Sequence, residues 1–211
     1  MKNTVIKYCG FTNEEDVNYA LQLNIEYIGF IFTKKSPRCV SLDMAKRLSE
    51  LCKNNLMTVG VFMDQSSDYI NEVITKTNIQ FLQFHGHESE EFCLQFGKPY
   101  IKTLHASNSL KNMNFEIFSK AHAILLDTKD ENDAGGTGKI FNWNILSQDH
   151  TIESLETNII VAGGLNPTNV GGLVSTYKPW GIDVSSGIES SIGKKDHTKM
   201  KEFIDNIDLS N

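Results

Sequence analysis

Two side chains with acid–base chemistry follow apolar runs that lie far apart in the sequence. Cys9 ends the run 5–9 and Asp127 ends the run 123–127. A cysteine acts as a base only as its thiolate, so its pKa, about 8.5 in a free thiol, must be lowered. An aspartic acid that donates a proton needs the opposite shift, which desolvation supplies. The pair is a candidate base and acid; an inert buried thiol and a structural carboxylate are the alternatives.

A third candidate is Arg38, which follows a Ser-Pro pair after the apolar run 27–32. A guanidinium binds a carboxylate through two parallel hydrogen bonds, and the proline restricts the loop that carries it. We expect Arg38 to bind a carboxylate of a substrate. The alternative is a solvated surface arginine beside Lys34 and Lys35.

The segment 85–88 reads His-Gly-His-Glu, which raises the question of a metal site. His85 and His87 are two candidate ligands on a turn, but sequence spacing places no third ligand beside them. We therefore expect no metal. The other histidines, at positions 105, 122, 150 and 197, are scattered, and we expect them to be solvated.

Short apolar runs that are nearly continuous in apolar character alternate with longer amphipathic stretches. Such runs are typical of strands that are covered on both faces. They span residues 5–9, 27–32, 58–63, 81–85, 100–104, 123–127, 159–162 and 181–184.

Helix signals lie between these runs. Thr12 and Glu15 have the spacing of a capping box, and Asn166-Pro167 indicates an N-cap with proline at the first helical position. Residues 197–207 carry apolar side chains on one helical face. Two segments are less regular: 108–120 has a poor helical pattern, and 129–139 is polar and glycine-rich, as an active-site loop would be.

Strands that alternate with helices predict right-handed βαβ units and a parallel sheet. Eight units predict an α/β protein with the (β/α)8 TIM-barrel fold, in which residues 1–211 form a single catalytic domain. An open, doubly wound sheet is the alternative. In a barrel, the residues that follow the strands meet at one mouth, so Cys9, Arg38 and Asp127 are expected to lie close together.

Glycine clusters follow the last runs of the predicted barrel. Gly163-Gly164 follows the seventh run, Ser185-Ser186-Gly187 follows the eighth, and residues 135–138 follow the sixth. Glycine lets backbone N–H groups approach a ligand, and the loops after strands seven and eight of such barrels often bind phosphate. We expect a phosphate site here; tight turns without a ligand are the alternative.

Composition limits the function further. The net charge of −6 argues against a nucleic-acid partner, which requires a basic face. The four cysteines form no C-x-x-C pair, so we expect free thiols. We find no signal peptide and no apolar stretch of membrane-spanning length, so a cytoplasmic protein without a membrane partner is expected. A monomer and a homodimer both remain open.

Motifs along the whole chain, in order, are similar to those of the phosphoribosylanthranilate isomerase family. Each motif is weak alone, but together and in order they are specific. They are Lys7-Tyr8-Cys9-Gly10 with Thr12, Ser36-Pro37-Arg38, Gly60-Val61-Phe62, Gln83-Phe84-His85-Gly86, Leu126-Asp127 followed by Gly136-Thr137-Gly138, Ala162-Gly163-Gly164-Leu165, the segment 183–189 and Lys195-Asp196.

The resemblance implies an Amadori rearrangement of a phosphosugar, N-(5-phosphoribosyl)anthranilate, in tryptophan biosynthesis. Asp127 would protonate the furanose ring oxygen, Cys9 as thiolate would remove the C2′ proton, and Arg38 would hold the carboxylate. No metal and no cofactor would be needed, because the imine intermediate is its own electron sink. Phosphate would lie on the backbone around Gly136, Gly138, Gly164, Ser186 and Gly187, and His85 and Asp183 would line the rest of the pocket.

This sequence departs from the family pattern at three positions. Asn142 stands where the family usually has aspartate, Thr103 where it usually has alanine, and Phe84 where leucine is common. None of them is the proposed acid, base or carboxylate ligand. Two other functions stay open: a metal-dependent ribulose-phosphate epimerase, for which His85, Asp127 and Asp183 form a poor ligand set, and a phosphosugar-binding barrel without catalysis.

Overall fold

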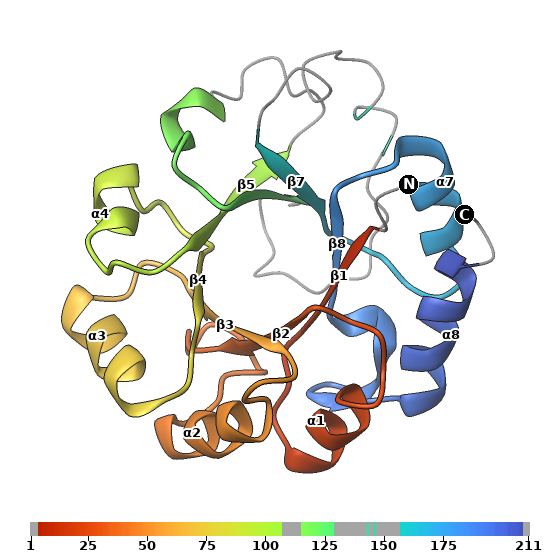
Figure 1. Cartoon of the computed structure of the whole chain (residues 1–211), viewed down its shortest axis with the longest axis horizontal. Coiled ribbons are helices and arrows are strands. Elements are labelled where there is room, and N and C mark those ends of the chain that lie inside the picture. Colours follow the sequence, from red (N-terminus) through yellow and green to blue (C-terminus); the bar gives the residue numbers. More distant parts are fainter. Residues whose placement is uncertain (1–3, 107–114, 129–142, 144–145, 147–156, 209–211) are drawn as a thin grey trace.

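The chain forms a closed barrel of eight parallel strands that pair in chain order, β1 to β8. The computed structural model describes residues 4–106, 115–128, 143, 146 and 157–208. The described helices lie around the outside of the barrel (Figure 1). The predicted barrel is confirmed, and the open doubly wound sheet is wrong.

The eight strands overlap the eight predicted apolar runs. The largest difference is in β5, which continues past the predicted end at Leu104. The strands are β1 (Val5–Cys9), β2 (Tyr27–Ile31), β3 (Met57–Phe62), β4 (Phe81–Phe84), β5 (Tyr100–Ala106), β6 (Ala123–Thr128), β7 (Asn158–Val161) and β8 (Gly181–Val184).

The elements outside the barrel include helices, two short 3-10 turns and a hairpin. The α-helices are α1 (Glu14–Ala20), α2 (Leu42–Leu51), α3 (Ser67–Lys76), α4 (Glu90–Leu94), α7 (Val170–Tyr177) and α8 (His197–Asp208). The 3-10 turns are η1 (Phe115–Phe118) and η2 (Ser186–Ile188), and β9 (Glu189–Ser191) pairs with β10 (Lys194–Lys195). Among the described helices, none combines the length and apolar character that a membrane span requires.

Two predicted helix starts are wrong by a few residues. The N-cap of α1 is Asn13, whose side chain accepts from Asp16 N, while Thr12 Oγ1 donates to Gly193 O in the β9–β10 hairpin. The N-cap of α7 is Asn169; Asn166 instead accepts from Thr168 in the turn before that helix. The Asn13 side chain caps its helix, whereas the Asn169 side chain makes no capping hydrogen bond.

Side chains alternate between the two faces of each strand, and this alternation selects the site residues. Ile6 and Tyr8 of β1 point outward into the main core, where they pack with residues of the helices. Residues of opposite parity fill the barrel, where Val59, Ile101 and Leu125 belong to a second cluster. Cys9 has the inward parity of β1, so its place at the end of the strand puts it in the mouth of the barrel.

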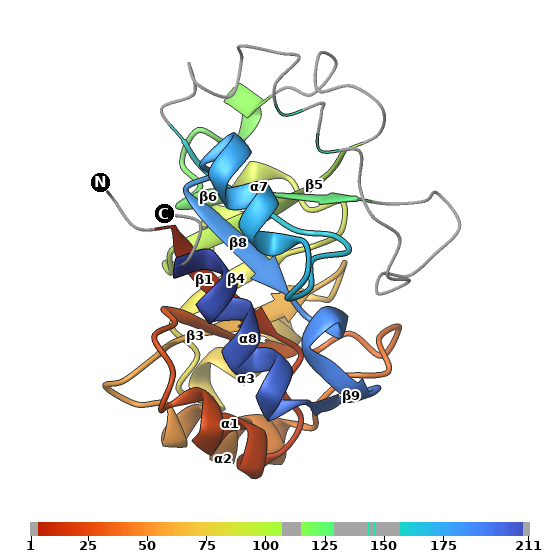
Figure 2. The same ribbon diagram turned by 90° about the vertical axis from the view of Figure 1, so that its right-hand side faces the viewer.

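The last part of the chain closes the barrel against the first. β8 pairs with β1, and Tyr8 Oη donates to Met200 O in α8 over 2.6 Å. From the β9–β10 hairpin, α8 runs back along the outside of the barrel (Figure 2). The mouth beside Cys9 is therefore built from both ends of the described chain.

Candidate active site

A cavity opens at the C-terminal ends of the strands, and five of the ten predicted site residues line it. Cys9, Arg38, His85, Asp127 and Asp183 all face this cavity. The inward parity of strands β1, β4, β6 and β8 explains the position of four of them, and the loop after β2 brings Arg38 to the same cavity. The other lining residues are Ile31, Thr33, Lys35, Ser36, Val61, Met63, Gln83 and Ser185.

Cys9 is held between two strands with little free space. It is buried, and its Cα pairs with Gly29 in the β1–β2 register. A Cβ at Gly29 would lie 2.7 Å from Cys9 Sγ, which is closer than real contacts allow. Glycine at this position therefore leaves the room that the thiol occupies.

The pKa of Cys9 is raised above its ordinary value, opposite to the expected lowering. Burial is the largest cause, and Asp183 adds to it. The ammonium groups of Lys7 and Lys195 act against burial by stabilising the thiolate, but only in part. The thiol is therefore the resting form of Cys9, and the two lysines reduce the free energy needed to ionise it.

An ion pair between a fully buried lysine and a partly exposed aspartate lies one layer below the thiol. Lys7 Nζ is 2.8 Å from Asp183 Oδ1, and the two residues are Cα partners across the β1–β8 junction. Burial alone would lower the pKa of Lys7, but Asp183 and Cys9 raise it above its ordinary value. Lys7 therefore carries a positive charge directly beneath Cys9.

Arg38 is buried in an ion-pair network, so the alternative of a solvated surface arginine is wrong. Its Nε and Nη2 each donate to Glu189, over 2.7 Å to the two carboxylate oxygens. Lys195 Nζ shares Glu189 Oε1 and also donates to the backbone carbonyls of Cys9 and Ser185. Burial alone would raise the pKa of Glu189, but Arg38 and Lys195 lower it. Glu189 therefore holds the side chains of Arg38 and Lys195 at the mouth of the barrel.

Asp127 lies beside His85, whose ring is oriented by Thr103. His85 Nε2 is 3.6 Å from Asp127 Oδ2. His85 Nδ1 is 3.1 Å from Thr103 Oγ1, and the same hydroxyl accepts from Gln83 Nε2. Thr103, a departure from the family pattern, thus takes part in the contacts that orient His85.

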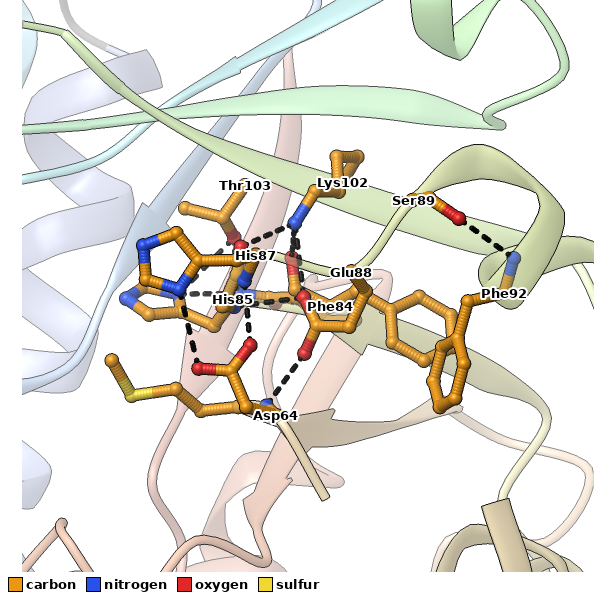
Figure 3. Close-up of polar contacts among 12 residues, drawn as sticks. Asp64, Phe84, His85, His87, Glu88, Ser89, Phe92, Lys102 and Thr103 are labelled. Carbon is orange, nitrogen blue, oxygen red and sulfur yellow. Dashed lines mark hydrogen bonds and ion pairs between the residues drawn. The ribbon is translucent and has the colours of Figure 1, made fainter. Parts of the chain in front are cut away.

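The loop that carries His85 is fixed by a second buried network (Figure 3). Glu88 forms a buried ion pair with Lys102 of β5, at 3.0 Å. The Glu88 carboxylate accepts from the backbone N–H groups of Asp64 and Gly86, so it ties the loop after β3 to the loop after β4. One carboxylate thus contacts both loops and the lysine of β5.

The predicted phosphate residues lie on the loops after β7 and β8, where the structure describes them. Gly164 has a positive φ of 68°. A Cβ at Gly187 would lie 1.8 Å from Leu165 O, so the two loops pack closely only because residue 187 is glycine. Ser186 and Gly187 form the start of η2. Gly136 and Gly138 lie outside the described residues, as do the segment 129–139 and Asn142.

Four residues near the site received no role from their positions in the sequence. Lys7, Glu189 and Lys195 occur in the motifs quoted for the family, but their buried contacts depend on barrel closure. His105 was expected to be solvated because the fifth run was ended at Leu104. The longer β5 gives it the inward parity of Thr103, and its ring lies 5.1 Å from that of His85. If the predicted fifth strand had been extended by two residues, the alternation of its side chains would have placed His105 in the barrel mouth.

The other buried cysteines, together with His122 and His197, have structural surroundings, and His150 lies outside the described residues. All four cysteines are free, as expected. Burial raises the pKa of Cys52 and of Cys93 to about 12, so neither is a reactive thiol at neutral pH. His122 bonds to Tyr27 Oη and His197 to Asp16, so the expectation that they are solvated is wrong.

A closed parallel barrel with its titratable side chains at the C-terminal mouth is the arrangement of (β/α)8-barrel enzymes. The fold and the site therefore define this class of protein. The mouth combines a thiol, a carboxyl group and a guanidinium, which suits proton transfer on an anionic substrate.

The family model for N-(5'-phosphoribosyl)anthranilate isomerase matches residues 6–206, and the chain belongs to this family. An isomerase of that name from Legionella pneumophila (strain Paris) is 42% identical over 200 residues, which are 94% of each chain. Monomers generated from the dimeric enzyme of Thermotoga maritima superpose with a TM-score of 0.82 at 31% identity, covering 98% of this chain and 99% of that one. A family structure in complex with reduced 1-(o-carboxyphenylamino)-1-deoxyribulose 5-phosphate also has a TM-score of 0.82, at 30% identity and the same coverage.

Proposed function

We propose that this protein isomerises N-(5'-phosphoribosyl)anthranilate to 1-(2-carboxyphenylamino)-1-deoxyribulose 5-phosphate, a step of tryptophan biosynthesis. The observation that carries the proposal is that Cys9 and Asp127 face one cavity in a chain of this isomerase family. A related structure holds the reduced form of the same product, which supports the choice of substrate.

The two catalytic roles are those that the resemblance to the family implies, and the positions of the two residues support them. Asp127, as the acid, protonates the furanose ring oxygen, which opens the ring to an imine. Cys9, as the thiolate, then removes the C2′ proton, and the resulting enolamine tautomerises to the ketone. The charges of Lys7 and Lys195 support the second step because both stabilise the Cys9 thiolate against its burial.

Arg38 is proposed to bind the anthranilate carboxylate with the N–H groups that Glu189 leaves available. A guanidinium has five N–H donors, and Glu189 takes two of them. The substrate phosphate is assigned to the loops after β7 and β8, at the backbone of Gly164, Ser186 and Gly187. These positions are supported by the left-handed Gly164 and by the close packing of the two loops.

Two buried polar atoms are candidates for the ribose hydroxyls. Ser185 Oγ and Gln83 Oε1 have no hydrogen-bond partner among the described residues, and both residues line the cavity. A buried polar group without a partner costs about 1–3 kcal/mol, so a ligand that bonds to it recovers free energy. We assign one hydroxyl of the opened sugar to each.

The test is a fluorescence assay of substrate consumption. Phosphoribosylanthranilate is generated in place from anthranilate and phosphoribosyl pyrophosphate by the preceding enzyme, and its decay is followed with and without EDTA. Rapid decay that EDTA leaves unchanged supports the proposal. Activity on ribulose phosphate that EDTA abolishes would favour the metal-dependent epimerase instead. Tight phosphosugar binding by a folded protein without turnover would favour the binding barrel.

The assembly state belongs to the same proposal. One relative from Thermotoga maritima is described as dimeric, so a homodimer and a monomer are both considered for this chain. Light scattering on the eluting size-exclusion peak separates a mass near 23.7 kDa from twice that value. No macromolecular partner beyond a second copy, no metal and no organic cofactor enter the proposed reaction.

A further inference from the structure

Three side chains with metal-binding atoms converge at the mouth of the barrel. They are His85 after β4, His105 in β5 and Asp127 in β6, from three consecutive strands. One ligand atom from each lies within 4.8 Å of the other two. His105 and Asp127 are also Cα partners in the β5–β6 register, so the sheet itself sets their separation.

The spacing is close to that of a coordination shell. Donors on a tetrahedral zinc ion, at about 2.0–2.1 Å from it, lie about 3.3 Å from each other. His85 Nε2 and Asp127 Oδ2 are 3.6 Å apart, so this pair needs almost no movement. The rings of His85 and His105 are inclined at 75°, and the ligand atom of His105, which lies within 4.8 Å of the other two, has to move closer to complete the shell.

A second observation points to a ligand at His85. Metal-bound histidines usually hold one ring nitrogen in a hydrogen bond, which orients the other toward the ion. Thr103 Oγ1 lies 3.1 Å from His85 Nδ1 (Figure 3), whereas Asp127 lies nearest to the other ring nitrogen, Nε2. Gln83 Nε2 donates to the same hydroxyl at 3.2 Å, so the hydroxyl is itself held in place.

We propose that His85, His105 and Asp127 bind a divalent first-row transition-metal ion, Zn2+ in particular, and that the bound ion inhibits the enzyme. The inhibitory part rests on the proposed function. A carboxylate that coordinates a metal cannot carry the proton that Asp127 must give to the ring oxygen. The ion also occupies the part of the cavity where the substrate has to approach Asp127.

The donor set selects the class of ion. Two imidazoles and one carboxylate suit Zn2+, Co2+ and Ni2+, whereas Mg2+ and Ca2+ prefer shells made of oxygen. Three protein ligands leave room for water on a four-coordinate ion, as in open zinc sites. Mg2+ is therefore the control ion.

Binding is measured first, without any assay of activity. The purified protein is titrated with Zn2+ by calorimetry and with Co2+ by visible absorption, which reports the ligand set. Thr103→Val should weaken binding by about 10- to 100-fold, the usual effect of losing a partner that orients a metal ligand. His85→Gln and His105→Gln should each weaken it by more than this, and Mg2+ should not bind.

His87→Gln is the matched control. His87 also lies beside a carboxylate, at 3.4 Å from Asp64, but its side chain is 91% exposed and it does not line the cavity. This variant should bind Zn2+ as tightly as the original protein. Equal affinity in His105→Gln and the original protein would overturn the proposal, because the ion would then occupy another site such as a thiol. Circular dichroism of each variant shows that it is folded.

Inhibition is then read as the rate with Zn2+ divided by the rate without it, for each variant separately. The original protein should lose activity in proportion to site occupancy and regain it with EDTA, and His105→Gln should resist the same Zn2+ concentration. Zn2+ that binds without lowering the rate would overturn the inhibitory part. No isomerase activity at any metal concentration would instead contradict the proposed function, and the binding data would still stand.

Discussion

Lys7 Nζ lies 2.8 Å from Asp183 Oδ1, across the junction where the first and last strands of the barrel pair. The Lys7 side chain has no exposed surface, whereas that of Asp183 is 12% exposed, so the lysine charge in particular depends on the carboxylate for its stabilisation. Removing one partner of a buried pair leaves the other charge without compensation.

Lys7→Met should therefore lower the free energy of unfolding by about 3–5 kcal/mol, measured by urea denaturation. Adding Asp183→Asn to the same protein should recover part of the loss, because no lone charge remains. Lys76→Met is the control, since Lys76 and Glu72 form an exposed pair on α3 and its loss should have a much smaller effect. Equal effects of the two methionine variants would contradict the assignment.

The ionisation of Cys9 is open to direct titration. Thiolate absorbance that is present in the original protein and missing in Cys9→Ala reports this residue alone. This absorbance should appear at a pH above the ordinary thiol pKa of about 8.5, because burial raises the pKa of Cys9. In Lys7→Met it should appear at still higher pH, since the cation that favours the thiolate is gone. A transition at or below the ordinary value would show that the lysines outweigh burial.

Cys9→Ser and Asp127→Asn should each lower kcat by about 100- to 10,000-fold with little change in KM, as expected for groups that act in the transition state. The measurement is steady-state kinetics with phosphoribosylanthranilate. Cys39→Ser is the control, because Cys39 is a half-buried thiol that does not line the cavity. Near-normal kcat in either catalytic variant would remove that residue from the mechanism.

Glu189→Gln should act on substrate binding through Arg38. The amide introduced at position 189 cannot accept two charge-assisted hydrogen bonds, so the Arg38 guanidinium loses its fixed orientation. We expect KM to rise about tenfold or more, with a smaller change in kcat. Arg38→Lys should give a similar rise, whereas Arg47→Ala, at an exposed arginine on α2, should leave KM unchanged. An unchanged KM in Arg38→Lys would exclude the carboxylate role.

Gly29→Ala tests the space around the thiol. The new Cβ would lie 2.7 Å from Cys9 Sγ, so the thiol has to move away from its present position. We expect a loss of kcat of at least about tenfold, since small misplacements of a reacting group are costly. Gly172→Ala in α7 is the control, because a Cβ there meets no atom within 4 Å. If both variants kept full activity, the position of Cys9 would not limit the reaction.

The barrel and most of its mouth could be predicted because strands covered on both faces are apolar and end at reactive residues. The apolar runs that end at Cys9 and Asp127 correctly predicted that both residues lie at the mouth of the barrel. The Arg38–Glu189–Lys195 network could not be derived, because it joins residues that are brought together only when β8 pairs with β1. His105 was missed for a simpler reason. The predicted fifth strand ended one residue before it, so the alternation of inward and outward side chains was not applied to this histidine.

The contacts of Cys9 have a consequence for the order in which the protein acquires activity. Lys195 donates to Cys9 O across 186 residues, and Lys7 bonds to Asp183 across 176. During synthesis, Cys9 leaves the ribosome long before either partner, and its part of the mouth stays incomplete until Lys195 has emerged. Contacts this distant in sequence form slowly and late in folding. A ribosome-bound nascent chain that ends before Asp183 is thus expected to be inactive, however well its first strands and helices have formed.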